Sequence, residues 1–299
     1  MKHFQISLMA VCLLTACTTD PSQHDPDPYD VHEWTDLIDE DLSNWDTYLS
    51  FQHQPGYDGT APVDEAGTPI EPIGLNHPDY AVFSTFEETG EWIIRNTGEY
   101  YGALITQASY HNYHLQLQYK WGDKTWAFRK HLLKDSGILY HSIGEMGAEY
   151  WRSWMLSQEF QIMEGHTGDF WSQATSAIDI RAYKPESNLD PVAHPSQEFL
   201  TFSMTSPYKN YCMRSSNFEL PHDEWNTLDL YCFGDKSLHV VNGEVVMILQ
   251  NSRYVNEQGE TIPLTEGKIQ LQSEAAELFF KGIRIRPIDS LSLAHQALF

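Results

Sequence analysis

Short runs in which apolar and polar residues alternate place the strongest constraint on the fold of this 299-residue chain. Residues 115–120 (LQLQYK) alternate in this way, and long helical periodicity is largely absent. Residues 238–241 (LHVV) and 244–247 (EVVM) flank an Asn-Gly pair, the strongest short signal for a β-hairpin. Residues 268–272 and 278–285 have the pattern of two closing strands. The sequence therefore predicts an all-β fold, a sandwich or jelly roll of antiparallel strands.

The first 16 residues have the features of a lipoprotein signal peptide. Lys2 supplies positive charge, and residues 6–14 form an apolar core too short to span a bilayer as a mature helix. Residues 14–17 (LTAC) resemble a bacterial lipoprotein cleavage box, which would make Cys17 the lipidated N-terminus. An ordinary signal peptide cut nearby is the alternative.

The rest of the chain divides into a tether and one domain. Residues 17–31 are polar and rich in proline, which predicts a flexible tether. Residues 32–299 show no second composition regime and are predicted to form a single domain, with a loop insertion near residues 54–78. Thr18 follows the lipidation site, so no Asp retention signal holds the protein at the inner membrane. By similarity to Gram-negative sorting, we expect an outer-membrane lipoprotein that faces the periplasm.

The charge of the chain excludes some partners. Eighteen Lys and Arg residues stand against 42 Asp and Glu residues, for a formal net charge of -24. Nucleic acid and anionic membrane surfaces need clustered positive charge, so membrane contact is expected through the lipid anchor alone. Aromatic residues make up 13% of the chain and suit stacking on sugar rings.

Two cysteines remain once the signal peptide and the lipidated residue are set aside. Cys212 and Cys232 each lie in a strand-like run, in a compartment that is expected to be oxidising. A disulfide between them and two buried free thiols are both consistent with the sequence.

Residues 159–166 (EFQIMEGH) form a strand-like run with two carboxylates, an amide and an imidazole. Successive side chains of a strand point to opposite faces, so Glu159 and Gln161 share one face. Glu164 falls on the other face unless a β-bulge, or a turn at Gly165, brings it back beside Glu159. Paired carboxylates suit acid/base chemistry on a sugar, so we predict Glu159 and Glu164 as catalytic residues.

Three further polar side chains are candidates around this run. Gln161 is predicted to bind a sugar hydroxyl, with an exposed strand amide as the alternative. His141 ends the apolar run 137–140 and is predicted as a catalytic base, with a metal-binding or structural role as alternatives. His166 is a candidate sugar-binding residue. His141, Glu164 and His166 together could also bind a divalent metal.

Other aromatic and polar residues complete the predicted sugar site. Trp154 and Trp171 bracket the carboxylate run, and each is either a stacking surface for a sugar or a core residue. Gln272 and Glu274 alternate on one predicted strand, so both can face the cleft that contains Glu159. An exposed sheet face is the alternative for this pair.

Five blocks of residues, in this order, resemble the 3-keto-disaccharide hydrolase family over residues 33–288: 102–122, 135–141, 159–171, 224–243 and 269–283. The resemblance implies a concanavalin-like β-sandwich of two sheets, a location in the bacterial envelope and a role in carbohydrate degradation. One position departs from the pattern, because His166 stands where the family pattern has Asp. This departure puts in doubt any shared metal site built from that position.

The resemblance also implies an activity. Family members are thought to cleave 3-keto-glycosides, which a partner oxidoreductase makes by oxidising C3 of a sugar. Cleavage would proceed by removal of the C2 proton, elimination at C1 and hydration, for which Lys134 and Arg152 are candidate enolate stabilisers. Two other functions stay open: a retaining glycosidase of the β-glucanase type, and a carbohydrate-binding module without catalysis. Gln161 replaces the middle Asp of the β-glucanase motif and weakens the first of these.

Overall fold

The computed structural model describes residues 31–52, 62–148, 153–186 and 189–299. The predicted signal peptide, Cys17 and nearly all of the tether lie outside these ranges, as do Arg152 and part of the predicted insertion. Strands dominate the described ranges, with one short 3₁₀ helix, η1 (Ala127–Arg129), and one short α-helix, α1 (Leu293–Gln296). No helix within them is long and apolar enough to cross a membrane.

Twelve strands of the described chain form the larger sheet, and its neighbouring strands are antiparallel. Its main path is β13 (Val192–Ala193), β12 (Ser176–Tyr183), β18 (Glu244–Val255), β17 (Lys236–Val241), β16 (Asn226–Phe233), β8 (Tyr113–Thr125), β21 (Ala276–Pro287), β5 (Glu91–Asn96) and β4 (Phe83–Glu88). Three strands pair beside this path: β1 (Thr35–Asp36) with β21, β14 (Phe199–Ser203) with β12, and β19 (Thr261–Pro263) with β18.

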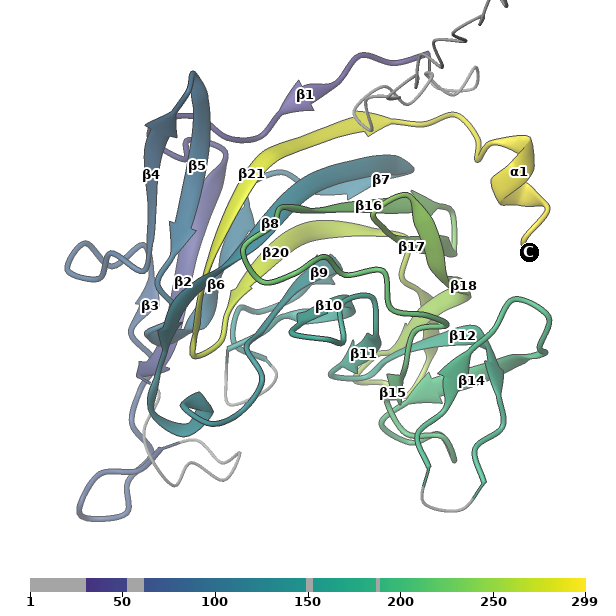
Figure 1. Cartoon of the computed structure of the whole chain (residues 1–299). Coiled ribbons are helices and arrows are strands. Elements are labelled where there is room, and N and C mark those ends of the chain that lie inside the picture. The colour runs from purple at the N-terminus through teal and green to yellow at the C-terminus, as the bar shows by residue number, and fades with distance from the viewer. Residues whose placement is uncertain (1–30, 53–61, 149–152, 187–188) are drawn as a thin grey trace, which may run out of the picture.

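Nine strands of the same described ranges form the smaller sheet, which is also antiparallel. Its order is β15 (Tyr211–Cys212), β11 (Phe170–Gln173), β10 (Leu156–Met163), β9 (Asp135–Ile143), β20 (Glu266–Ser273), β6 (Tyr100–Thr106), β2 (Trp45–Gln52) and β3 (Gly74–Leu75), and β7 (Tyr110–His111) pairs with β20. Figure 1 shows β21, β8 and β16 arching over β20, β9 and β10.

The main hydrophobic core lies between the two sheets. Leu115 and Leu117 of β8 are buried there, while the polar residues that alternate with them stay partly exposed. From the smaller sheet, Tyr140 and Phe160 pack into the same core. The predicted all-β sandwich of two antiparallel sheets is therefore confirmed, and its strands follow the alternation seen in the sequence.

The predicted Asn-Gly hairpin joins β17 to β18. Val241 pairs with Glu244 across it, and the two turn residues, Asn242 and Gly243, have φ angles of 50° and 86°. Two consecutive positive φ values define a type I′ turn, whose twist matches that of the flanking strands. The hairpin that the sequence predicted at Asn242-Gly243 is therefore present.

The two remaining cysteines are free thiols. Cys212 lies on β15 of the smaller sheet and packs in a cluster with Phe170, whereas Cys232 lies on β16 of the larger sheet in the main core. Burial raises the pKa of the Cys232 thiol to about 12, so it stays protonated. The disulfide that the sequence left open is not formed, because the thiols lie in different clusters.

His239 is a buried, neutral histidine of the main core. Its ring stacks on Phe160 with centroids 4.2 Å apart, and its Nε2 accepts a hydrogen bond from Tyr140 at 3.2 Å. Burial lowers the pKa of His239 from the ordinary value of 6.5 to about 3. The folded protein therefore does not bind a proton that the unfolded chain takes up below pH 6.5.

We predict that His239 makes the protein less stable in mild acid. The contribution of neutral His239 to the free energy of unfolding is fully present above pH 6.5. It is lost as the pH falls towards 3, at about 1.4 kcal/mol per pH unit. Urea unfolding between pH 7.5 and 5 should show a shallower pH dependence for His239→Phe than for the wild type. Other titrating groups are common to both proteins and cancel in this difference. An unchanged slope in the variant would contradict the assignment of His239 as neutral.

Candidate active site

A cavity of about 490 Å³ lies on the face of the smaller sheet that is turned away from the main core. Along β10, Phe160 and Ile162 point into the core. The residues that alternate with them, Glu159, Gln161 and Met163, line the cavity. Packing of the apolar half of β10 therefore places the polar half in the cavity.

Gly137 of β9 lets two functional side chains lie flat against the sheet. A Cβ atom at this position would be 2.6 Å from Glu159 Oε1 and 2.5 Å from Gln272 Oε1. Glu159 from β10 and Gln272 from β20 therefore reach across β9 and meet above its backbone. A glycine inside a strand often marks such a close approach, and this signal was present in the sequence.

One buried arginine joins two carboxylates at the edge of the cavity. Arg129 of η1 places Nη2 2.5 Å from Asp135 Oδ2 and 2.6 Å from Glu274 Oε1. Gln161 donates a hydrogen bond from Nε2 to the other oxygen of Asp135, at 2.8 Å. All four side chains line the cavity. The sequence predicted Gln161 and Glu274 as site residues but missed Arg129 and Asp135, whose meeting depends on contacts between distant segments.

Glu159 is the carboxyl group of the site that contacts no cation in the described structure. It is 3% exposed, and Gln173 donates a hydrogen bond to its Oε2 at 2.5 Å. Burial, followed by the charges of Glu274 and Asp135, raises the pKa of Glu159 well above its usual range. This shift favours the protonated form of Glu159, which is the form that can donate a proton to a bound ligand.

Asp135 and Glu274 differ from Glu159 because they share a cation. Burial raises the pKa of both, and the Arg129 guanidinium opposes the shift. For Glu274 the charge of Arg129 is the largest opposing influence. Within the described ranges, the cavity thus combines one carboxyl group that has no cationic partner, Glu159, with a pair of carboxylates that share Arg129.

Two amide oxygens in the cavity can accept hydrogen bonds from a ligand. Gln161 Oε1 and Gln272 Oε1 are buried, and neither finds a partner within the described part of the protein. Buried acceptors without a partner are rare and costly. Hydroxyl groups of a bound molecule would satisfy both.

Two tryptophans form walls of the cavity. Trp154 is buried and makes an edge contact with Tyr101, at 6.4 Å between ring centroids. Trp171 of β11 is partly exposed and packs on Tyr211, at 4.5 Å. Six of the predicted site residues therefore meet in one cavity, and their roles stay predictions: Glu159, Gln161, Trp154, Trp171, Gln272 and Glu274.

Glu164 does not join Glu159. The register shift in β10 falls between Leu156 and Gln158, before Glu159, and the strand ends at Met163. Glu164 begins the following turn, where its backbone N–H donates to Lys134, and its side chain is not among those that line the cavity. Pairing of the two glutamates needs a bulge between Glu159 and Glu164, and the irregularity of β10 lies before Glu159 instead.

His141 lies in the core instead of the cavity. Its left-handed φ of 52° disturbs the alternation of β9, and its ring packs edge-on against Tyr113 and Tyr140. Its Nδ1 donates to the carbonyl of Leu264 at 3.1 Å, and burial lowers the pKa to about 4. The alternative interpretation of His141 as a hydrogen-bonded structural residue fits this position.

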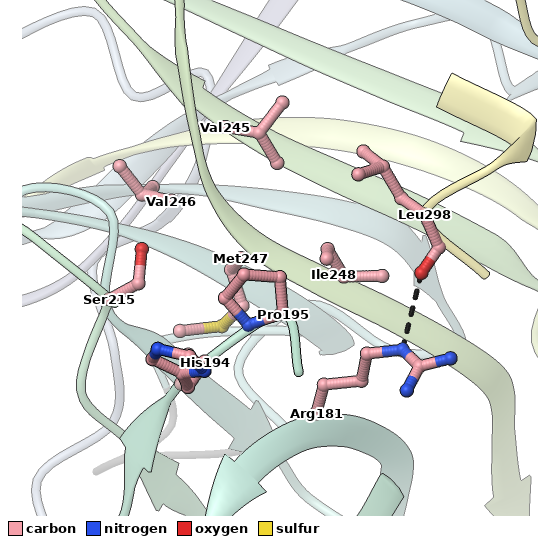
Figure 2. A pocket seen from close by; sticks show the side chains of 10 residues that line it. Arg181, His194, Pro195, Ser215, Val245, Val246, Met247, Ile248 and Leu298 are labelled. Atoms are coloured by element: carbon pink, nitrogen blue, oxygen red, sulfur yellow. Dashed lines mark hydrogen bonds between the residues drawn. The ribbon is translucent and has the colours of Figure 1, made fainter. Parts of the chain in front are cut away.

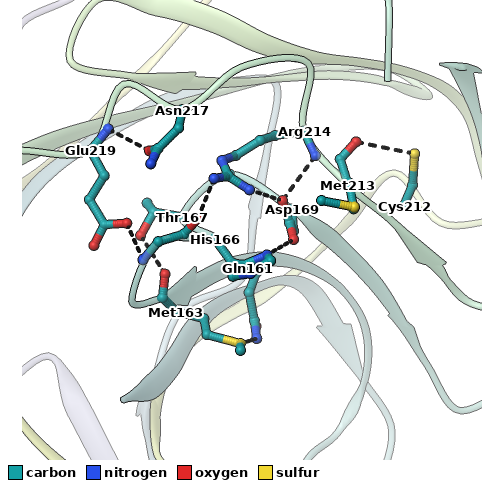
Figure 3. Close-up of polar contacts among 12 residues, drawn as sticks. Gln161, Met163, His166, Thr167, Asp169, Cys212, Met213, Arg214, Asn217 and Glu219 are labelled. Carbon is teal, nitrogen blue, oxygen red and sulfur yellow. Dashed lines mark hydrogen bonds and ion pairs between the residues drawn. The ribbon is translucent and has the colours of Figure 1, made fainter. Parts of the chain in front are cut away.

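His166 lies in the turn after β10 and does not line the cavity. Its Nδ1 donates to Asp169 Oδ2 at 3.0 Å. Arg214 donates to Asp169 and to the carbonyl of Gly165 on the same turn, and Figure 3 shows Arg214 beside Asp169. His166 is thus part of a polar network that holds the turn, and not of the predicted sugar contacts.

The residues present do not fit the divalent metal that the sequence left open. No three His, Cys, Asp or Glu side chains in the described ranges are placed to hold a metal ion. His141 and Glu164 lie towards opposite ends of β9, and Arg129 already lies between the two carboxylates of the cavity. Lys134, a predicted enolate stabiliser, donates to the carbonyl of Gly122 and is not part of the lining.

A second, smaller cavity of about 100 Å³ lies beside β18. Figure 2 shows Arg181 on its wall, where Nε donates to the carbonyl of Leu298. Its other walls come mainly from apolar residues, and no carboxylate side chain lines it. The larger cavity is therefore the candidate active site.

We predict that Arg129→Met destabilises the protein in a pH-dependent way. Removing the cation leaves the Asp135 and Glu274 carboxylates buried without a partner, which costs roughly 3–5 kcal/mol near neutral pH. Protonation of these carboxyl groups relieves the cost, so urea unfolding should show a smaller loss at pH 5 than at pH 8. Lys281→Met, which removes a more exposed ion pair with Glu91, is the control and should cost at most about 1 kcal/mol. Equal losses at both pH values would contradict the prediction.

Comparison with known proteins identifies the family. The family model of the 3-keto-alpha-glucoside-1,2-lyase-like domain matches residues 33–286, whereas no curated protein matches the sequence. A solved structure of a putative glycosyl hydrolase from Parabacteroides distasonis ATCC 8503 is 18% identical, with a TM-score of 0.45, and the match covers 86% of this chain and 100% of that one. LamAcat from Zobellia galactanivorans is 11% identical, with a TM-score of 0.38 and coverage of 84% and 97%. Because the family model spans most of the chain and confirms the resemblance seen in the sequence, the protein belongs to the 3-keto-alpha-glucoside-1,2-lyase-like family.

Proposed function

We propose that this protein cleaves the glycosidic bond of 3-keto-glycosides in the cavity around Glu159. The observation that carries the proposal is the contrast between Glu159, a buried carboxyl with a raised pKa, and a carboxylate pair bound to Arg129. Such a contrast separates a proton donor from a proton acceptor within one site. The family to which the chain belongs supports a glycosidic substrate.

The ketone at C3 of the substrate determines which catalytic groups the protein must supply. It acidifies the C2 proton, so a base can remove that proton and leave the electron pair on the C3 oxygen as an enolate. The enolate then expels the oxygen on C1, which takes a proton from an acid of the protein. Water adds to C1 of the enone, C2 regains a proton, and the acid and base return to their starting states. The site therefore needs a base, an acid and a cation near the enolate oxygen.

Each role has a candidate in the cavity. Glu274 is the proposed base, since its pKa is raised by burial while Arg129 favours the charged form. Arg129 is the proposed partner of the enolate oxygen, as a buried cation that Asp135 and Glu274 hold in place. Glu159 is the proposed acid, because burial raises its pKa and so favours its protonated form. Gln161 and Gln272 supply free amide oxygens for the sugar hydroxyls.

The retaining glycosidase is a weaker proposal. A retaining mechanism needs a nucleophile roughly 5–5.5 Å from the acid. In the β-glucanase pattern this partner would be Glu164, which does not line the cavity. A binding module without catalysis remains an outcome of the assay described below.

We predict that the purified protein without its first 17 residues releases sugar from a 3-keto-glycoside and not from the unoxidised parent. Glu159→Gln should lower kcat by at least about 100-fold, because an amide cannot donate the proton that the leaving oxygen needs. Product analysis by chromatography measures both results. Release from the parent alone would favour the glycosidase, and binding without release would favour the module.

The pH profile gives a second readout of Glu159. The protonated acid is required, so kcat should be retained below the raised pKa of Glu159 and lost as pH rises through it. His111→Gln, a change on an exposed residue of β7 outside the cavity, is the control and should keep the wild-type profile. A rate that rises across this range would exclude Glu159 as the acid.

The cellular setting is also part of the proposal. A lipid anchor at Cys17 would hold the enzyme on the periplasmic side of the outer membrane, where a partner oxidoreductase that oxidises C3 would supply its substrate. Support comes from the LTAC box and the polar tether. Cys17→Ala should move the protein from the membrane fraction to the soluble periplasm, as measured by fractionation and immunoblotting. A membrane-bound variant would contradict the anchor.

A further inference from the structure

The two ends of the large cavity differ in charge. At one end, β9 and β20 bring Asp135 and Glu274 together with Arg129. At the other end, β11 and the segment before β15 contribute Trp171 and Asn210, which are uncharged. Glu159 pairs in register with Trp171 on one side and with Leu139 of β9 on the other. The proposed acid therefore lies at the boundary between a charged end and a neutral, aromatic end.

At the neutral end Trp171 lines the cavity and Tyr211 packs against it, and we define these two residues as the aromatic platform. The two residues are cross-strand partners on β11 and β15, and their rings pack at 4.5 Å between centroids. Because Phe170, the preceding residue, is buried on the opposite face, Trp171 faces the cavity. An aromatic ring with an open face suits the apolar side of a sugar or another flat ring.

Asp169 holds the platform in place. Its carboxylate accepts hydrogen bonds from the Tyr211 hydroxyl, from His166 at 3.0 Å, and from Arg214 through the backbone N–H at 2.9 Å and Nη1 at 3.0 Å. Asp169 is fully buried, and Figure 3 shows its contacts with Arg214. A platform anchored in this way loses little freedom when a ligand binds, which favours affinity.

The groups beside the platform select an uncharged ligand. Gln173, Asn210 and Met204 line this end and offer amide hydrogen bonds and apolar contact. Burial, followed by the charge of Asp169, raises the pKa of Tyr211, so its hydroxyl stays neutral. A cavity of about 490 Å³ is also within the range of about 300–1,000 Å³ that holds ligands larger than one sugar ring.

We propose that the Trp171–Tyr211 platform is the subsite for the leaving group, and that it takes an uncharged ring such as a second sugar. The 3-keto ring then lies between Glu159 and Glu274, and the glycosidic oxygen lies beside Glu159. This assignment rests on the proposed function, and it adds the orientation of the substrate and the residues that bind its leaving group. Trp171 is a specificity-determining residue under this proposal, and Asp169 is a positioning residue.

Two substrates test the subsite: a 3-keto-glucosyl disaccharide and the matching methyl 3-keto-glucoside, which lacks the second ring. Trp171→Ala should lower kcat/KM for the disaccharide by about 10-fold, the effect of losing one aromatic stacking contact. The methyl glycoside should change by less than about 2-fold. Trp225→Ala, a tryptophan outside the cavity that lies under Lys120 and Lys281, is the matched control and should leave both values unchanged.

A second variant separates positioning from structure. Tyr211→Phe keeps the ring but loses the hydrogen bond to Asp169. It should raise KM for the disaccharide while kcat stays within about 2-fold, because the reacting groups at the charged end are untouched. The methyl glycoside should again be unaffected, which shows that the variant is folded.

The outcomes distinguish this assignment from the proposed function. Equal losses for both substrates in Trp171→Ala, or no loss for either, would overturn the leaving-group subsite while cleavage by the wild type upholds the function. Cleavage of neither substrate by the wild type would overturn the function and the assignment together. A selective loss for the disaccharide supports both.

Discussion

The alternation of side chains along β9 and β10 ties the hydrophobic core to the chemistry of the cavity. Phe160 stacks on His239, and Phe160 and Ile162 of β10 are both buried in the core. A slip of one residue would turn Glu159 into the core and Phe160 into the cavity, so the register is strongly specified. The positions of the catalytic candidates are thus a consequence of how the sandwich packs, and not of a separate loop structure.

The cavity contains buried charged side chains, which folded proteins usually avoid. Asp135, Glu159 and Glu274 are each at most 6% exposed, and the one cation that contacts any of them in the described structure is Arg129. Burial of three carboxyl groups around one cation destabilises the folded state and raises the pKa of all three. The same arrangement favours the protonated form of Glu159, while Arg129 favours the charged form of Glu274. Under the proposed function, the groups that lower the stability of the fold are therefore those that serve acid/base chemistry.

The alternation of residues in the sequence predicted correctly those side-chain positions that depend on the regular period of a strand. It failed where a single residue breaks that period. Glu159 and Gln161 share a face because nothing interrupts β10 between them. His141, predicted as a catalytic base, lies in the core, where its left-handed backbone disturbs the alternation of β9, and no pattern in the sequence indicates this break. Arg129 was missed for a different reason, since it reaches Glu274 across 145 residues of chain. Contacts between distant segments depend on how the strands are arranged, and periodicity does not contain that information.

The order of groups across the smaller sheet matches the order of events along the substrate. From β20 through β10 to β11 the cavity presents the proposed base, the proposed acid and the aromatic platform. In a 3-keto-glycoside the corresponding order is the C2 proton, the glycosidic oxygen and the leaving group. Because β9 lies between β20 and β10, the backbones that carry the proposed base and the proposed acid are two strand spacings apart, about 9.6 Å. Glu159 shortens this gap by reaching over Gly137 of β9, so the order of the groups along the sheet follows the order of the reacting atoms in the proposed substrate.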